Sequence, residues 1–124
     1  MSLASIRAQV AAYLDGDFYN VLPYPPAQPL ANTIAVVPDD PYYQMGSLGL
    51  NGLTIRFKLT LWVKALDNQG NLAELENLIE EVLLKLPPGI KVTQASQPSL
   101  LTMDNGTNLI TTDLSIEVST ILGD

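Results

Sequence analysis

The residues best suited to chemistry in this sequence are two pairs of carboxylates, Asp15 with Asp17 and Asp39 with Asp40. Two carboxylates can divide general acid and base work between them when a fold holds them in one pocket. Each pair here lies beside glycine or proline, in segments where aspartate is favoured because its side chain completes a turn. We therefore interpret both pairs as turn residues and predict that the protein is not an enzyme. A hydrolase built on these carboxylates is the alternative interpretation.

The sequence contains few residues of the types that other catalytic sites or metal sites require. The sequence contains no cysteine and no histidine, which removes thiolate and imidazole metal ligands and the common nucleophile–base pairs. Residues 67–78 begin like a calcium-binding loop, but such a loop needs glycine at its sixth position and glutamate at its twelfth. This sequence has Leu72 and Leu78 there. We predict no catalytic residue, no metal site and no cofactor.

The composition predicts a surface with unusually little charge. Charged residues make up 15% of the chain, against about 25% in an average soluble domain, and the mean hydropathy is +0.18. We infer that other subunits cover part of the surface, because large uncharged surfaces mark interaction sites. The alternative is a monomer whose surface consists of neutral polar side chains.

The length and the net charge of the chain limit which classes of protein remain possible. A chain of 124 residues fits one domain with a substantial core, and we expect a single domain over residues 1–124. The net charge of −7 argues against general phosphate binding, which needs a basic surface. We recognise neither a signal-like leader nor an apolar run of the roughly 20 residues that a bilayer requires. We therefore expect a soluble protein that works in a reducing cytoplasm.

Residues 53–65 alternate between two kinds of side chain for thirteen positions. A period of two indicates a half-buried strand, because successive side chains of a strand point to opposite faces. The predicted strand is longer than the usual length of about 5–6 residues. Its polar face carries Trp62 and three of the six cations of the chain, which are Arg56, Lys58 and Lys64.

Helical spacing of apolar residues predicts one helix over residues 2–15 and another over residues 71–86. In the second helix Asn71 and Glu74 resemble a capping box, with asparagine as the N-cap. Its buried stripe is predicted to consist of Leu72, Leu75, Leu78, Ile79, Val82, Leu83 and Leu86.

Turn and breaker residues divide the rest of the chain into strands. Residues 23–29 contain four prolines and are expected to be an extended connector. Residues 38–41 are expected to close the strand before them, and residues 104–107 predict a tight hairpin turn. Strands are predicted over residues 18–22, 33–37, 53–65, 90–103 and 109–122. These elements predict an α+β fold: a mostly antiparallel sheet with two helices packed on one face and a long β-hairpin at the C-terminus.

One candidate contact surface follows the proline-bounded segment at residues 38–41. Residues 42–45 are expected to begin as a strand, and residues 46–52 to form a mobile loop that carries large apolar side chains where loops normally carry polar ones. We predict that this loop docks on a partner, the alternative being a loop folded back over its own core. The docking residues are predicted to be Tyr42, Tyr43, Met45, Leu48 and Leu50.

The second candidate surface is the polar face of residues 53–65 together with the acidic residues of the last strand. Its charges can pair across strands, at about 0.2–1 kcal/mol per pair. They can also match an acidic neighbouring subunit, with Trp62 as an apolar anchor, because tryptophan and arginine concentrate at binding hot spots. Both interpretations stay open. This predicted subunit-interface face consists of Arg56, Lys58, Trp62, Lys64, Asp113 and Glu117.

The order of these elements resembles that of the tail terminator (tail completion) proteins of long-tailed bacteriophages. The resemblance covers nearly the whole chain and rests on layout, because this family has no fixed catalytic motif. It includes an opening helix with Ile6-Arg7-Ala8 and a proline-rich link before Thr33-Ile34-Ala35-Val36-Val37-Pro38. The long strand at residues 53–65, the helix at residues 71–86 and the closing hairpin complete the pattern.

The resemblance implies a structural virion protein that forms a ring, usually a hexamer, on the end of the tail tube. Such a ring stops polymerisation of the tube and joins it to the head-side connector, so the tail tube protein and the head–tail connector protein are its expected partners. Six copies would carry a formal charge of −42, six times −7, and an acidic lumen lets DNA pass without specific binding. The expected location is the virion tail or neck, after assembly in the host cytoplasm and without a membrane. The alternatives are a head-closure or connector (head completion) protein of the phage neck and a small non-enzymatic protein-binding adaptor.

Overall fold

A computed structural model describes residues 3–16, 19–27, 31–45, 52–64, 68–102 and 108–121. Within these ranges there are two helices, α1 (Leu3–Tyr13) and α2 (Asn68–Lys85). Six described strands form one sheet. The strands are β1 (Asn20–Leu22), β2 (Thr33–Met45), β3 (Gly52–Lys64), β4 (Ile90–Ala95), β5 (Ser99–Thr102) and β6 (Asn108–Ile121).

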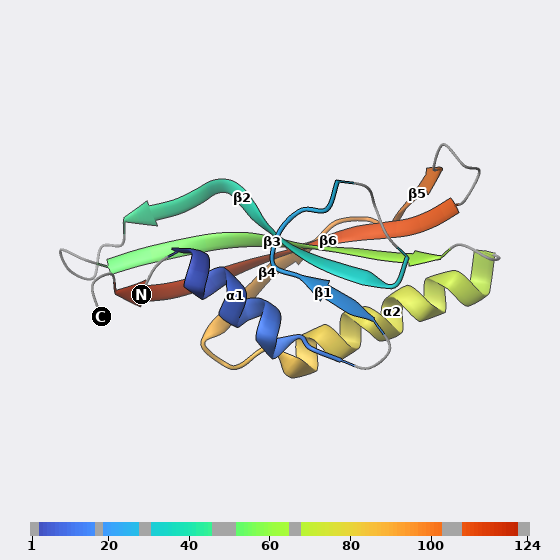
Figure 1. Ribbon diagram of the computed structural model, residues 1–124. Helices are drawn as coiled ribbons and strands as arrows, with labels where there is room; N and C mark the ends of the chain where they lie inside the picture. The colour runs from blue at the N-terminus through green and yellow to red at the C-terminus, as the bar shows by residue number, and fades with distance from the viewer. Residues whose placement is uncertain are drawn as a thin grey trace.

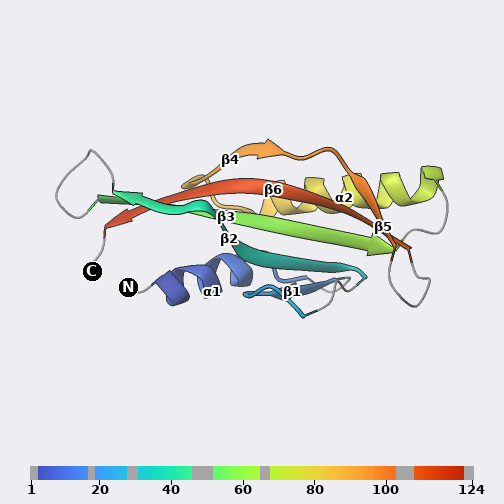
Figure 2. The same cartoon turned by 90° about the horizontal axis from the view of Figure 1, so that it is seen from above.

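The sheet has the order β1-β2-β3-β6-β4, and β5 also pairs with β6. All paired strands are antiparallel except β1 and β2, which run parallel. Both described helices lie below the sheet in Figure 1. Figure 2 shows that α1 lies towards the β1 and β2 edge and α2 towards the β6 and β4 edge. The predicted α+β fold is therefore confirmed, although the C-terminal hairpin has a first arm, β5, of four residues instead of one long strand over residues 90–103.

The core lies between the helices and the inner face of β3. This strand pairs with β6 along its whole length, from Gly52↔Ile121 to Lys64↔Leu109, and with β2 on its other side. Its inner side chains are at most 3% exposed, and they pack against apolar residues of both helices in one cluster. Each large side chain buried in this way contributes about 1.5–3 kcal/mol to folding. The inner residues of β3 are Leu53, Ile55, Phe57, Leu59, Leu61 and Val63.

Strand β2 continues through the segment that was predicted to end it. Pro38 and Pro41 both lie inside the strand, and the pairing with β3 shifts in register between Pro38 and Tyr43. In the described structure β1 pairs only with Thr33, Ile34 and Ala35, so the later part of β2 is an edge. A proline lacks the N–H that a ladder uses, but on an edge no neighbouring strand requires it. The turn predicted at residues 38–41 is therefore wrong, and a bulged edge takes its place.

Helix α2 differs from its predicted form at two points. It begins at Asn68, so Asn71 lies inside the helix and the predicted capping box is wrong. Its stripe is also narrower than predicted, because Leu72 and Leu83 are 41% and 46% exposed. Helical periodicity defines the apolar side of a helix, but the sheet decides how wide a part of that side is covered. The stripe members that are buried are Leu75, Leu78 and Val82, with Ile79 and Leu86 partly buried.

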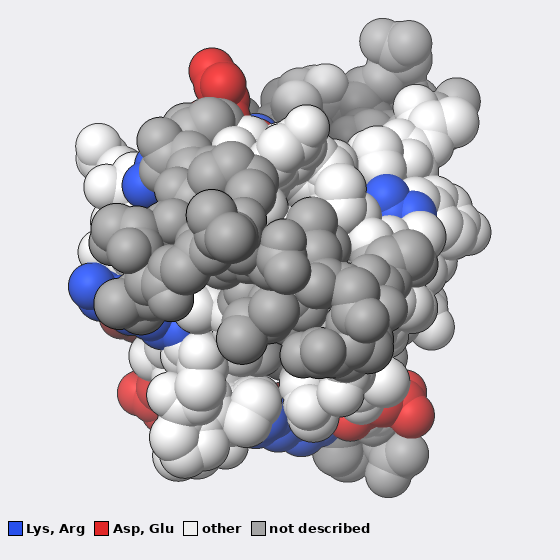
Figure 3. Space-filling view, turned by 90° about the vertical axis from the view of Figure 1, so that its left-hand side faces the viewer, with Lys and Arg blue, Asp and Glu red and all other residues white. Residues whose placement is uncertain are grey.

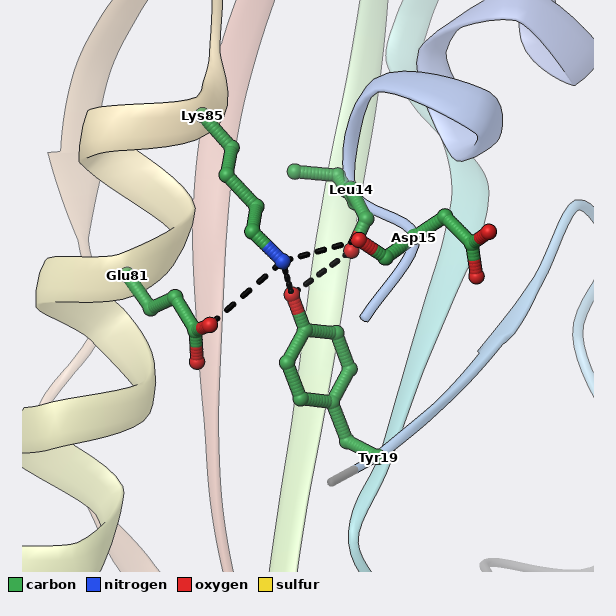
Figure 4. Close-up of polar contacts among 5 residues, drawn as sticks. All are labelled: Leu14, Asp15, Tyr19, Glu81 and Lys85. Carbon is green, nitrogen blue, oxygen red and sulfur yellow. Dashed lines mark hydrogen bonds and ion pairs between the residues drawn. The ribbon is translucent and has the colours of Figure 1, made fainter. Parts of the chain in front are cut away.

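The ends of the two helices are held together by Lys85 (Figure 4). Its Nζ donates hydrogen bonds to the carbonyl oxygen of Asp15 and to the hydroxyl oxygen of Tyr19, both at 2.8 Å. The same Nζ lies 3.4 Å from a carboxylate oxygen of Glu81. The Tyr19 hydroxyl in turn donates to the carbonyl oxygen of Leu14 at 2.6 Å. The Lys85 ammonium group thus lies at the C-terminal end of α1. A cation is favourable there, because this end of the helix dipole is negative.

This contact requires a close approach at Gly16. A Cβ atom at this position would lie 2.7 Å from Cζ of Tyr19 and 2.8 Å from Nζ of Lys85. Both distances are shorter than atoms in van der Waals contact allow. The turn after α1 therefore has space for glycine, and a larger residue would displace the lysine or the tyrosine ring.

The same contacts make the stability depend on pH at the alkaline end. The hydrogen bond with Tyr19, aided by the Glu81 carboxylate, raises the pKa of Lys85 above 10.5 although desolvation opposes the shift. A group whose pKa is higher in the folded state stabilises the fold fully below its unfolded pKa. That contribution is lost as the pH rises through the folded pKa.

We predict that Lys85→Met lowers the free energy of unfolding at pH 8 by about 2 kcal/mol, because two hydrogen bonds from a charged donor are removed. Urea denaturation measures this difference. Lys91→Met, at an exposed lysine of β4, is the control and should change stability by less than about 0.5 kcal/mol. The difference between wild type and Lys85→Met should shrink above pH 10.5; a variant as stable as wild type at pH 8 would show that the contact is not stabilising.

Candidate subunit-interface surface

The outer face of the sheet is the face that points away from both helices. The register of β3 and β6 places Arg56 opposite Glu117 and Thr60 opposite Asp113. The alternation along β3 puts the other polar positions on the same side as Arg56. The outer face therefore brings together all of the residues that the sequence assigned to a subunit interface, which are Arg56, Lys58, Trp62, Lys64, Asp113 and Glu117.

Three of these charged side chains contact a neighbour on the adjacent strand. The Nε of Arg56 lies 3.4 Å from Oε1 of Glu117, with the two side chains 34% and 26% exposed. This contact is an ion pair without an aligned hydrogen bond, because the buried Nε has no hydrogen-bond partner among the described residues. Asp113 Oδ1 accepts a hydrogen bond of 2.8 Å from Oγ1 of Thr60. The predicted pairing of charges across strands is therefore found between Arg56 and Glu117, whereas Asp113 contacts the neutral side chain of Thr60.

The two lysines of β3 differ from Arg56 in their contacts. Lys58 is half-buried and Lys64 is exposed. In the part of the chain that the structure describes, neither lysine has an ion-pair partner. Among the described residues the outer face thus carries these two lysines and Arg56 alongside the carboxylates of Asp113 and Glu117.

Trp62 lies on the predicted face but is only 8% exposed. It forms a second apolar cluster with Ala35 and Leu109, against which Val37 and Leu101 pack. The expectation that Trp62 offers an exposed anchor is therefore wrong for the single chain. The physical reason is β5, which pairs with β6 and sets Leu101 directly opposite Leu109, next to the tryptophan. A strand pattern alone does not reveal such a distant covering segment.

A trough of about 330 Å³ lies on the outer face beside the arginine–glutamate pair. Its lining includes Asp39 and Asp40 of β2, Arg56 of β3, and Ser115 and Glu117 of β6. The Asp39 carboxylate accepts a 2.8 Å hydrogen bond from the backbone N–H of Asp40, so this pair has a local backbone role. No group of three side chains able to ligate a metal occurs within the described ranges. The trough can receive a charged or polar side chain.

A second hollow, of about 310 Å³, lies between α2, β3 and the residues just before β1 and β2. Tyr19 and Val63 form its apolar floor, and Glu74, Asn77 and Glu81 line it from α2. The carboxylates are exposed to solvent at its rim, and Glu81 already contacts Lys85.

None of the helices in the described ranges is long and apolar enough to cross a bilayer.

The predicted docking loop is described only at its start. Tyr43 is 52% exposed at the far end of β2. Tyr42 is half-buried instead, with its ring edge-on to Phe57 at 5.8 Å between centroids and to Tyr43 at 6.1 Å. Met45 belongs to β2, and its side chain lies outside the described part. Leu48 and Leu50 also lie outside the described residues, so their docking role stays a prediction.

Sequence reasoning missed two exposed apolar side chains. Leu84 is 86% exposed on α2 and Leu100 is 65% exposed on β5. The signal for Leu84 was present, because it falls outside the helical stripe of the neighbouring buried residues. Leu100 had no such signal, since the strand that carries it has no clear alternation.

We predict that Trp62→Ala lowers the free energy of unfolding by about 3–5 kcal/mol, because it opens a cavity in the outer-face cluster. Urea denaturation of the isolated chain provides the measurement. Lys64→Ala, on the same strand and exposed, should cost less than about 0.5 kcal/mol. Equal stabilities of Trp62→Ala and wild type would mean that the tryptophan is a surface residue after all.

A scan against protein-family models finds no matching family for this chain. A search of curated proteins finds no matching relative.

Proposed function

We propose that this protein is a tail terminator, a structural virion protein that forms a ring on the end of a phage tail tube. The ring stops polymerisation of the tube and joins it to the head-side connector. The observation that carries the proposal is a chain with few charged residues that exposes large apolar side chains at several separate places. These include Tyr43 at the far end of β2, Leu84 on α2 and Leu100 on β5.

Several separate apolar sites suit a ring subunit, because each subunit meets two neighbours and the end of the tube. Isolated apolar residues occur on many monomers. Here they accompany a chain with only 15% charged residues. Figure 3 views the molecule from the end where β2 reaches Met45, and uncharged surface exceeds charged surface among the described residues there. An end of this kind is suited to contact with another protein.

The shape of the sheet gives further support. Strands β2, β3 and β6 have 13 or 14 residues each and run nearly the length of the molecule (Figure 1). The described part of β2 ends at Met45, far from β5 and from the start of α2. A long sheet with one end free of the second helix can reach along a tube while its body contacts neighbouring subunits. The net charge of −7 per chain suits a lumen through which DNA moves without adhering.

The test is polymerisation of the cognate tail tube protein with and without this chain, viewed by electron microscopy. A terminator yields tubes of limited length with a ring at one end. Tubes of unlimited length in a molar excess of the folded protein would refute the proposal. Rings that bind the connector protein but leave the tube uncapped would favour a head-closure role.

We predict that Tyr43→Ser reduces attachment to the tube end at least about tenfold, because an exposed aromatic side chain at the centre of a contact typically carries 2 kcal/mol or more of binding free energy. Co-sedimentation with preformed tubes measures the attachment. Tyr24→Ser removes an equally exposed tyrosine outside the proposed contact sites and is the matched control. Both variants should keep the wild-type unfolding midpoint; undiminished attachment of Tyr43→Ser would remove this end of β2 from the contact.

A further inference from the structure

One edge of the sheet is open at β5. The described structure pairs β5 with β6 on one side and with no strand on the other. Ser99, Leu100 and Thr102 are exposed, and Leu100 is 65% exposed. The backbone N–H and C=O groups on the free side of such a strand are a template for pairing with another chain.

The other edges of the described sheet carry features that hinder such pairing. Strand β1 has three residues and runs directly into Pro23. The later part of β2 contains Pro38 and Pro41 together with a shift in register. Strand β4 has an exposed lysine, Lys91, and a shift in register of its own. Prolines, lysines and bulges all protect an edge against the addition of a strand. Strand β5 is short as well, but its four residues include no proline, no charge and no shift in register.

The occupant that fits this edge is the same strand of a second copy. Residues 92–103 carry no charge, and neither do residues 108–111 of β6, which pair with β5. Two chains of net charge −7 repel each other, so identical copies approach with the least repulsion at an uncharged edge. The uncharged residues 42–45 of β2 lie at the opposite end of the sheet, where the proposed function places the tube (Figure 1). The open edge that one copy offers to another is therefore β5.

The alternation along β5 limits which residues can meet. Leu101 packs against the cluster of Trp62 on the outer face, so Leu100 points to the helix side. A two-fold axis perpendicular to the sheet keeps the helices of both copies on one side, and each residue then lies opposite a residue of the same face. The register that covers the exposed Leu100 sets it opposite Leu100 of the second copy, with Ser99 opposite Leu101.

We propose that β5 pairs in antiparallel orientation with β5 of a second copy, with Leu100 opposite Leu100 at the two-fold axis. Backbone hydrogen bonds between the two strands join the sheets edge to edge, and the two leucine side chains cover each other. Such a contact uses the same surface on both chains and closes on itself. The dimer goes beyond the proposed function, because it can form whether or not the ring does.

A single cysteine tests the register, because the chain contains no cysteine of its own. Opposite residues of antiparallel strands have Cα atoms about 4.5–5.5 Å apart, and a disulfide requires about 4.4–6.8 Å. Leu100→Cys should therefore form a disulfide-linked dimer under mild oxidation. Thr102→Cys is the matched control on the same strand. It would lie opposite Pro98 of the second copy, so the two cysteines would be about 13 Å apart, which is four residues of about 3.3 Å each. The disulfide should form at least about tenfold faster at position 100 than at position 102.

A charge at the same place should prevent the pairing. Leu100→Lys should associate at least about tenfold more weakly than wild type in sedimentation velocity, because two lysines would lie directly opposite each other. Tyr24→Lys, at an exposed tyrosine just after β1, is the control and should associate as wild type does. Circular dichroism should show every variant folded.

Equal rates of disulfide formation at positions 100 and 102, or unchanged association of folded Leu100→Lys, would overturn the proposal. Both measurements are made on the full chain without tube protein. A dimer whose chains leave tubes uncapped would therefore refute the proposed function alone, and capped tubes without the dimer would refute this contact alone.

Discussion

Because β3 pairs along its full length with β6 and on its other side with β2, each of its side chains must point either to the helices or to the outer face. The inner set, from Leu53 to Val63, forms the floor of the main core. The outer set carries Arg56, Lys58 and Lys64 and part of a second cluster around Trp62. One strand thus specifies both the stability of the domain and the charges that it presents. A slip of one residue in its register would exchange these two faces.

The features predicted most accurately from the sequence are the helices and strands that local side-chain patterns determine. The alternation at residues 53–65 predicted β3 to within one residue at each end, and helical spacing predicted both helices and the buried Leu75 and Val82. These predictions succeed because side-chain periodicity follows directly from the geometry of strand and helix. The confirmed α+β fold follows from the order of such elements.

What the sequence could not predict depends on distant segments. Prolines at positions 38 and 41 are breakers in most contexts, and here they are tolerated because β1 is too short to pair with that part of β2. Trp62 has a surface position by alternation and is buried because β5 pairs beside it. Leu83 belongs to the predicted apolar stripe of α2, yet it is 46% exposed. At the predicted docking loop the structure describes Tyr42 and Tyr43, and the roles of Leu48 and Leu50 stay predictions.

The cations of this chain divide into two groups with different consequences. Lys85 and Arg56 are engaged within the fold, the first with the end of α1 and the second with Glu117. Lys58 and Lys64 have no ion-pair partner among the described residues. Under the proposed function, contacts with other copies and with the tail tube would cover the exposed apolar side chains.

The mass of the purified full chain, measured by native mass spectrometry over a range of concentrations, tests this account most directly. The account predicts one discrete multiple of 13.4 kDa, formed at low concentration or on addition of the tail tube protein. A species of 13.4 kDa at every concentration, with and without the tube protein, would contradict it.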